Sequence, residues 1–98
     1  MKKRTYMYEL CEGRHDSPAK EGIFPHTVDS KLIGDPIRLR DIADAKIPKD
    51  CGRLVIFVTG LTVAMLAVVS VCVERNIMLT CYHQDPITKM YDRQNVIK

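Results

Sequence analysis

The longest apolar segment of the chain runs from Leu54 to Val73 and contains no charged residue. Its length matches that of a membrane-spanning helix. However, Leu54 to Thr59 is rich in the β-branched and aromatic residues that favour strands, and Gly60 follows where the backbone can turn sharply. We therefore interpret the segment as a buried strand that leads into a buried helix over about Leu61 to Arg75. A membrane span remains the alternative.

Shorter apolar patterns predict three further strands. Alternating aromatic and aliphatic positions mark Thr5 to Cys11. Ile77 to His83 comes directly after the polar residues that end the helix. Met90 to Ile97 follows the turn residues Gln84-Asp85-Pro86 and is expected to return antiparallel as an edge strand. Because strand, helix and strand in succession form the unit of a parallel sheet, the central part of the chain predicts parallel pairing.

Two segments carry weaker signals. Arg14 to Asp35 contains glycines and prolines without a helical period, which predicts a long irregular loop. Asp35-Pro36 resembles a helix cap and first turn, whereas the next four residues alternate like a strand. Of the two possibilities we favour a strand over Ile37 to Ile42.

These elements predict one α/β domain over residues 1–98, a small Rossmann-like parallel or mixed sheet with one long buried helix. The composition, 46% hydrophobic and 28% charged, is that of an ordinary globular chain. A helix that is apolar on nearly every side needs more cover than so small a domain supplies. We therefore expect a homo-oligomer with the Leu61 to Val73 helix near the interface.

The net charge and the cysteine positions bear on which partners and which compartment the chain has. The net charge of +3 is modest and partly due to Lys2-Lys3-Arg4, so binding to a long nucleic acid is not expected. The four cysteines form no C-x-x-C pair, and Cys72 and Cys81 have apolar neighbours, which is typical of buried, reduced thiols. Tyr6 to Glu12 is too short and polar for a secretory signal. We expect a cytoplasmic protein without a metal or cofactor.

Candidate chemistry is concentrated in three loops expected beyond the carboxyl ends of the strands, where open α/β sheets bind ligands. At Thr59-Gly60-Leu61-Thr62 a strand passes directly into a helix, whose free N–H groups and dipole attract an anion. Thr62 is equally well explained as a helix cap. Arg14-His15-Asp16-Ser17 with Lys20 suits a phosphate, the alternative being a polar surface loop.

The third loop begins at Tyr82-His83, where Tyr82 can stack on a base and His83 can donate a hydrogen bond or a proton. A structural role for His83 is the alternative. The expected ligand is a compact polyanion such as a nucleotide, and the predicted ligand-binding residues are Arg14, His15, Ser17, Lys20, Thr59, Gly60, Thr62, Tyr82 and His83.

Leu54 to His83, with Arg14 to Lys20 as a first-loop counterpart, resembles the small Rossmann-like nucleotide-sensing domains of CRISPR-associated and related anti-phage signalling systems. In those domains a strand, a Gly/Thr-containing turn and a helix bind a cyclic oligonucleotide across a dimer interface. This chain is shorter, has no clear helix after the first strand and carries no effector domain.

The resemblance implies a protein that binds and sequesters a cyclic nucleotide signal, as phage anti-defence proteins do. A metal-independent ring nuclease that uses His15 or His83 for proton transfer is the enzymatic alternative, and a structural or small membrane protein is the third. We favour a binding protein over an enzyme.

Overall fold

A computed structural model describes residues 3–13, 18–58, 61–85 and 87–98. Five strands form one sheet in the order β2-β1-β3-β4-β5, in which the first four strands are parallel and β5 is antiparallel to β4. The elements are β1 (Arg4–Cys11), β2 (Gly22–Phe24), α1 (Ser30–Ile33), α2 (Pro36–Lys46), β3 (Cys51–Val58), α3 (Thr62–Arg75), β4 (Met78–Gln84) and β5 (Tyr91–Ile97). The predicted α/β class with a mixed sheet and one long helix is confirmed.

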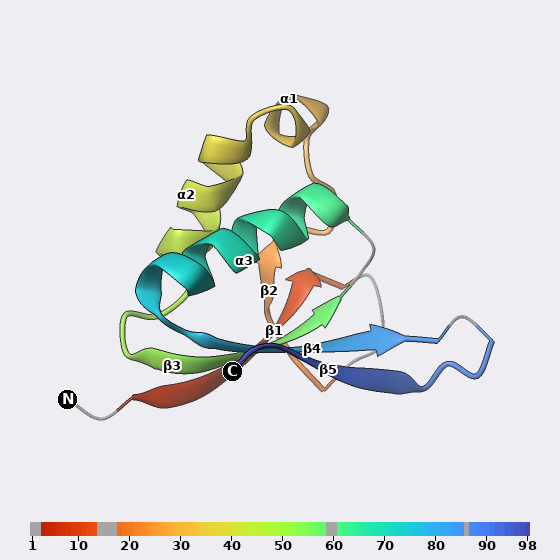
Figure 1. Ribbon diagram of the computed structural model, residues 1–98. Helices are drawn as coiled ribbons and strands as arrows, with labels where there is room; N and C mark the ends of the chain where they lie inside the picture. The colour runs from red at the N-terminus through yellow and green to blue at the C-terminus, as the bar shows by residue number, and fades with distance from the viewer. Residues whose placement is uncertain (1–2, 14–17, 59–60, 86) are drawn as a thin grey trace.

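All three helices lie on one face of the sheet (Figure 1). The steps from β2 to β3 and from β3 to β4 move in the same direction across the sheet, so right-handed crossovers place α2 and α3 on the same side. The step from β1 to β2 moves in the opposite direction. Consistently, Ala19 from that connection packs against Val55 and Phe57, away from the main core. We call this second side of the sheet the open face.

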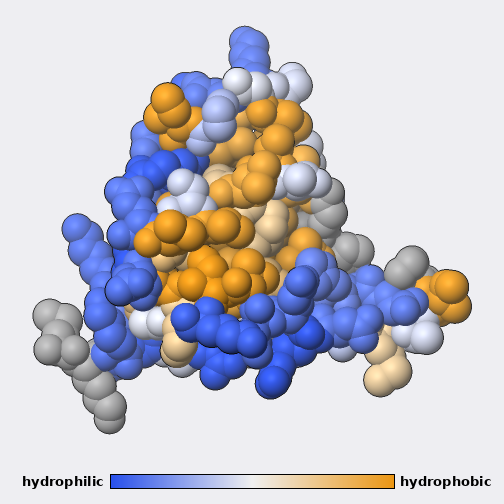
Figure 2. Space-filling model, in the orientation of Figure 1, coloured by the Kyte–Doolittle hydropathy of each residue, from blue (hydrophilic) through white to orange (hydrophobic). Residues whose placement is uncertain are grey.

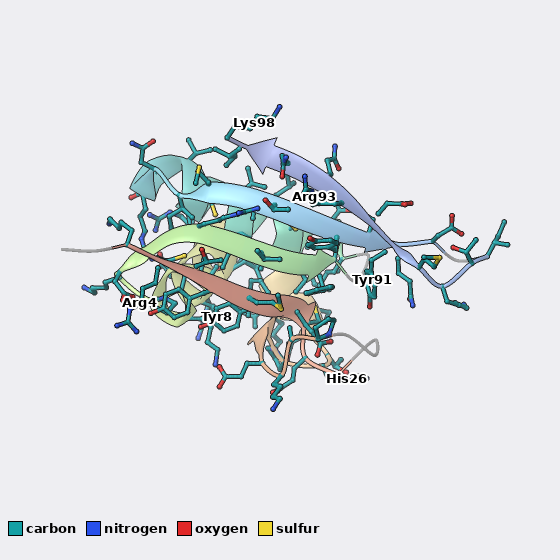
Figure 3. All side chains as sticks on the ribbon, turned by 90° about the horizontal axis from the view of Figure 1, so that it is seen from below. Arg4, Tyr8, His26, Tyr91, Arg93 and Lys98 are labelled. Carbon is teal, nitrogen blue, oxygen red and sulfur yellow. The ribbon has the colours of Figure 1, made fainter. Side chains whose placement is uncertain are left out.

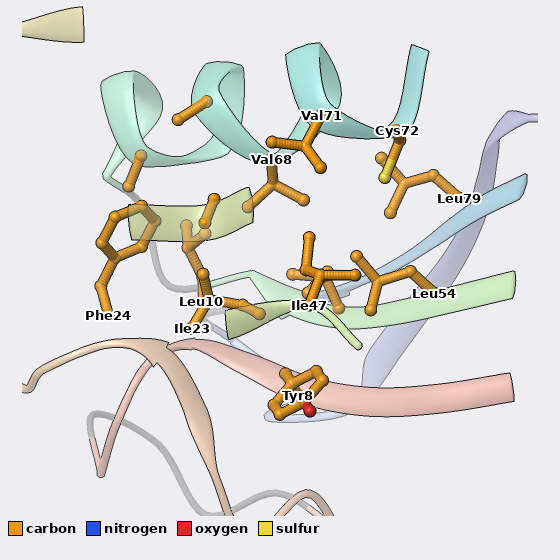
Figure 4. Packing of buried hydrophobic residues seen from close by; sticks show 14 of the residues in the cluster. Tyr8, Leu10, Ile23, Phe24, Ile47, Leu54, Val68, Val71, Cys72 and Leu79 are labelled. Carbon is orange, nitrogen blue, oxygen red and sulfur yellow. The ribbon is translucent and has the colours of Figure 1, made fainter. Parts of the chain in front are cut away.

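The main core lies between α3 and the sheet (Figure 4). Helix α3 buries Ala64, Ala67, Val68, Val71 and Cys72 against strand residues such as Leu54 and Leu79. It ends at Asn76, which adopts the left-handed conformation (φ 59°), and the Asn76 N–H contacts the carbonyl oxygens of the last turn. The predicted helix is thus confirmed to within one residue at its start.

The strand predicted over Ile37 to Ile42 is wrong, because this segment belongs to helix α2. The Asp35 carboxylate accepts a hydrogen bond from the Arg38 N–H at 3.1 Å, and Pro36 occupies the first turn, where its missing N–H costs nothing. Leu39 and Ala43, four residues apart, are the buried positions of α2. The alternation of apolar and charged residues at the start of this segment therefore does not mark a strand. It belongs to a helix that buries only these two side chains.

The irregular loop predicted over Arg14 to Asp35 contains two short elements, β2 and α1, within its described part. Strand β2 has three residues, all buried, and pairs in parallel with β1. The backbone of Gly22 approaches Glu12 so closely that an added Cβ would lie 2.5 Å from the Glu12 nitrogen. A three-residue strand leaves too short a pattern to be recognised in sequence.

All four cysteines are buried free thiols, which confirms the expectation of burial for Cys72 and Cys81. Burial raises the pKa of Cys72 to about 12 and that of Cys81 to about 11. In the part of the chain that the structure describes, no helix combines the length and the hydrophobicity needed to cross a membrane.

Candidate functional site

The open face carries a row of four side chains that crosses four strands. Glu9 on β1 is paired with Phe57 on β3, Phe57 with Tyr82 on β4, and Tyr82 with Arg93 on β5. Since neighbouring strands are about 4.8 Å apart, the row is about 14 Å long. It therefore lines up a buried carboxylate, a buried ring, a half-exposed ring and an exposed guanidinium group on one side of the sheet.

The two rings of this row, Phe57 and Tyr82, form a compact ring cluster with Tyr91 of β5. The rings of Phe57 and Tyr82 are stacked, with centroids 5.1 Å apart and planes 15° apart. Tyr91 contacts Phe57 edge-on, also with centroids 5.1 Å apart. Phe57 is buried beneath its neighbours, whereas Tyr82 and Tyr91 are half-exposed. Figure 3 views this face, with Tyr91 and Arg93 labelled on β5.

A polar row lies beside the ring cluster. Arg53 Nη2 donates to Thr80 Oγ1 at 3.4 Å, and the Thr80 hydroxyl donates to Asn95 Oδ1 at 3.0 Å. Arg53 and Arg93 are both exposed. The open face therefore presents two cations around a partly exposed aromatic surface.

The turn between β4 and β5 fixes the register that brings Arg93 opposite Tyr82. Asp85 Oδ1 accepts hydrogen bonds from the backbone N–H groups of Ile87, at 2.8 Å, and Thr88, at 3.1 Å. The hydrogen bonds from Thr88 and Ile87 lower the pKa of the Asp85 carboxyl group. Asp85 consequently remains charged and holds the turn closed over the neutral pH range.

The start of α3 supplies a different kind of anion-binding group. No side chain caps this helix at Leu61, whereas α1 and α2 are capped by Asp29 and Asp35. Within the described residues, the first N–H groups of α3 are thus given no capping side chain, and Thr62 is exposed beside them. They lie at the edge where the parallel strands end (Figure 1).

This edge also contains the point where the strand order reverses. From β1 the chain moves outward to β2 and then returns across β1 to β3, so the reversal falls between β1 and β3. Ligands of open α/β sheets bind outside the carboxyl ends of the strands at such a position. The uncapped start of α3 follows β3 by three residues in the chain.

The structure does not gather the described members of the predicted site at one place. Tyr82 belongs to the ring cluster on the open face, and Thr62 lies at the start of α3, on the helix-bearing side. His83 points to the helix-bearing side, because successive strand residues alternate, and its Nε2 lies 3.1 Å from Gln94 Oε1. Lys20 lies beside the middle of β1, where it shares a shallow pocket with Tyr6, Met7 and Tyr8. Arg14, His15, Ser17, Thr59 and Gly60 lie outside the described residues.

Sequence reasoning missed Glu9, Phe57, Tyr91 and Arg93. Each occupies the same side of its strand as Tyr82, so the two-residue alternation of the strands carried the signal. Alternation alone does not tell which side of the sheet is exposed. It identifies these residues as a shared surface only once the helices are known to cover the other face. Among the described residues no three His, Cys, Asp or Glu side chains form a potential metal site.

No protein-family model, curated protein or solved structure matches this chain, so its function has to be inferred from its own side chains.

Proposed function

We propose that this chain binds and sequesters a small nucleotide-type molecule, with cyclic nucleotides as the first class to test. The observation that carries the proposal is the ring cluster, half-exposed beside Arg93 on a sheet face that no helix of the described part covers. Stacking of a base on an aromatic side chain contributes about 1–3 kcal/mol. The ring cluster therefore offers an aromatic surface for a base.

The phosphate groups of such a ligand have two suitable partners. Arg93 is the cross-strand neighbour of Tyr82, and a guanidinium group can bind a phosphate through two parallel hydrogen bonds. The uncapped N–H groups of α3 provide a second, dipolar anion site at the carboxyl edge. Either position suits a phosphate group, whereas an uncharged nucleoside would use neither.

Native mass spectrometry of the purified protein with cyclic mono-, di- and oligonucleotides tests this proposal. We expect a stable complex with at least one member, and recovery of intact ligand after heat denaturation. A linear product would instead support the ring-nuclease alternative. No complex with any member at about 100 μM would refute nucleotide binding, since useful sequestration requires micromolar or better affinity.

Two variants separate stacking from general folding effects. Tyr82→Ala removes the ring and is expected to weaken binding about 5- to 150-fold, the equivalent of a 1–3 kcal/mol stacking contribution. Tyr82→Phe keeps the ring and should bind nearly as well as the wild type. Equal loss in both variants would show that the hydroxyl group, rather than stacking, determines affinity.

We also propose that the protein self-associates through the outer side of α2 and α3. Ile37, Leu66 and Val73 are 73%, 62% and 65% exposed there, and apolar side chains gather over these helices in Figure 2. A groove of about 280 Å³ lies between the helices, and Ile37, Ala67 and Ser70 are among the residues that line it. Leu66 also lines it, so one surface contains both a projecting side chain and a hollow.

The charges around this groove favour a second copy of the chain as its occupant. Helix α3 has no charged residue before Glu74, and Glu74 is paired with Arg40 at the groove margin. Two copies related by a twofold axis would therefore bring together apolar surfaces bordered by internally neutralised charges. In such a dimer, each copy would contribute the exposed Leu66 side chain and the groove beside it, as an isologous interface requires.

Light scattering at micromolar concentration tests this interface. Leu66→Glu should convert an oligomer to a monomer because it places a charge in the apolar contact. Ile87→Glu is the matched control, since Ile87 is also exposed, at 89%, but lies in the turn between β4 and β5. A wild-type protein that is already a monodisperse monomer would refute self-association.

A further inference from the structure

Strand β1 has a neighbour along only part of its outer side, the side away from β3. Strand β3 pairs with β1 from Arg4 to Glu9, whereas β2 pairs only with Glu9 and Cys11. Residues 4–8 therefore have no strand beside them on the outer side in the described part of the chain. We call this segment the free edge; Figure 3 labels Arg4 and Tyr8 at its two ends.

The backbone of the free edge is oriented to pair with another extended chain. The Glu9 N–H points to the outer side, where it donates to the Glu21 carbonyl oxygen at 2.9 Å. Because backbone groups alternate between the two sides of a strand, Thr5 and Met7 direct their N–H and C=O groups to the same outer side. Both residues are exposed, so an added strand can reach these groups.

The opposite edge of the sheet, β5, is less suited to accept a strand. Its pairing with β4 contains one extra residue, Val96, in β5 itself. Such bulges bend and twist an edge strand and so discourage further pairing. The comparable irregularity near the start of β1 lies in β3, where Gly52 is the extra residue. The free edge of β1 is therefore the more regular template.

A shallow pocket of about 380 Å³ lies along the free edge and would receive the side chains of an added strand. Its lining residues are Tyr6, Met7, Tyr8, Lys20 and Glu21. Tyr6 and Tyr8 pack with the main core on the helix-bearing side. Met7 lies on the open face and is 44% exposed. An added strand would thus meet aromatic rings on one of its faces and Met7 with Lys20 on the other.

The charges around the free edge favour an acidic occupant. The Asp50 carboxylate contacts Arg4 at 3.6 Å. The Glu21 carboxylate contacts Lys46, also at 3.6 Å. Lys20 lines the pocket and has no ion pair among the described residues. The pocket therefore keeps a positive charge that a carboxylate of a partner can complement.

We propose that the free edge binds an extended, acidic segment of a partner protein, which adds to β1 as a strand in line with β2. Its backbone pairs with Thr5 and Met7, as in other complexes formed by strand addition. Alternate side chains of the segment are apolar and contact Tyr6 and Tyr8, and those between them are acidic and face Lys20. This surface is separate from the ring cluster, from the start of α3 and from the groove between α2 and α3.

The free edge of a second copy is a poorer occupant. Lys3 directly precedes β1 and is exposed, so each copy has a cation at the start of its free edge and Lys20 near the end. Antiparallel pairing of two free edges would bring Lys3 of one copy to Lys20 of the other. Like charges on neighbouring strands are unfavourable, so a partner of opposite charge fits better.

Titration with a short peptide of alternating valine and glutamate, followed by NMR, tests the proposal. In the free protein the amides of Thr5 and Met7 should exchange with solvent faster than those of Tyr6 and Tyr8, which face β3. The peptide should slow exchange at Thr5 and Met7. A peptide of alternating valine and lysine is the matched control and should bind at least about 5-fold more weakly.

Three results of this titration would overturn the proposal. They are no binding of the glutamate peptide at about 1 mM, equal affinity for the two peptides, and protection of β5 instead of β1. Absence of nucleotide binding or of self-association would leave the proposal unaffected, since neither uses the free edge.

Protein variants locate the contact. Lys20→Glu should weaken binding of the glutamate peptide at least about 5-fold at low salt. Lys31→Glu makes the same charge change at an exposed position of α1 and should have little effect. Equal losses in the two variants would show a general charge effect and would overturn the proposed site.

Met7→Pro tests strand addition itself. It removes an N–H group that points outward, so it should block an added strand without removing a hydrogen bond to β3. Thermal unfolding shows whether this variant folds. Unchanged peptide binding by folded Met7→Pro would overturn strand addition; if the variant does not fold, the comparison of Lys20→Glu with Lys31→Glu decides.

Discussion

Arg75 links the end of α3 to the turn that follows α2. Its guanidinium group donates to the carbonyl oxygens of Ile47, at 3.1 Å, and Pro48, at 2.5 Å, and also contacts Asp44 at 3.3 Å. The Arg75 side chain is only 21% exposed. Arg75→Ala would therefore leave two backbone carbonyl oxygens at the α2–β3 turn without their donors.

The expected cost can be estimated from these contacts. A hydrogen bond that involves a charged group contributes about 1.5–3 kcal/mol, but water can partly replace a donor at a site that is not fully buried. We expect Arg75→Ala to lower the free energy of unfolding by about 2–3 kcal/mol. For a domain of this size, that loss corresponds to a decrease in Tm of roughly 10–20 °C. Urea denaturation at a fixed protein concentration measures it.

Arg40→Ala is the matched control. Arg40 pairs with the carboxylates of Asp41 and Glu74, which are 65% and 58% exposed. Such surface ion pairs contribute about 0–1 kcal/mol. A similar loss in the two variants would refute the reasoning, since backbone carbonyl oxygens and exposed carboxylates would then be equivalent partners.

Three further predictions concern the fold. Asp35→Ala should cost about 1 kcal/mol in urea denaturation, because it removes the α2 cap. Gly22→Ala should cost about 1–3 kcal/mol through its contact with the backbone, whereas Gly34→Ala, with 3.9 Å to its nearest neighbour, should be nearly neutral. Burial raises the pKa values of Cys72 and Cys81 from 9 to about 12 and about 11, so stability should be unaffected below pH 9 and fall as pH rises towards 11–12. A flat pH–stability profile between pH 9 and 11 would contradict the last prediction.

The sequence by itself determined the elements whose signals are local. The split of the apolar segment into strand and helix followed from the residue types of Leu54 to Thr59 and from the uncharged helix after them. The final antiparallel strand followed from the turn residues before it. The segment from Ile37 to Ile42 was assigned wrongly as a strand. Asp35-Pro36 indicated a helix start, but a helix that buries only Leu39 and Ala43 shows too little helical periodicity to outweigh the local alternation.

The tertiary structure decided which residues share a surface. Strand order and crossover direction put α2 and α3 on one face and left the other face to Glu9, the ring cluster and Arg93. Alternation along β4 directs Tyr82 to the open face and its sequence neighbour His83 to the helix-bearing side. Side-chain alternation is a local property, but the identity of the covered face depends on how distant strands pair. The open face could therefore be recognised only after the sheet had been assembled.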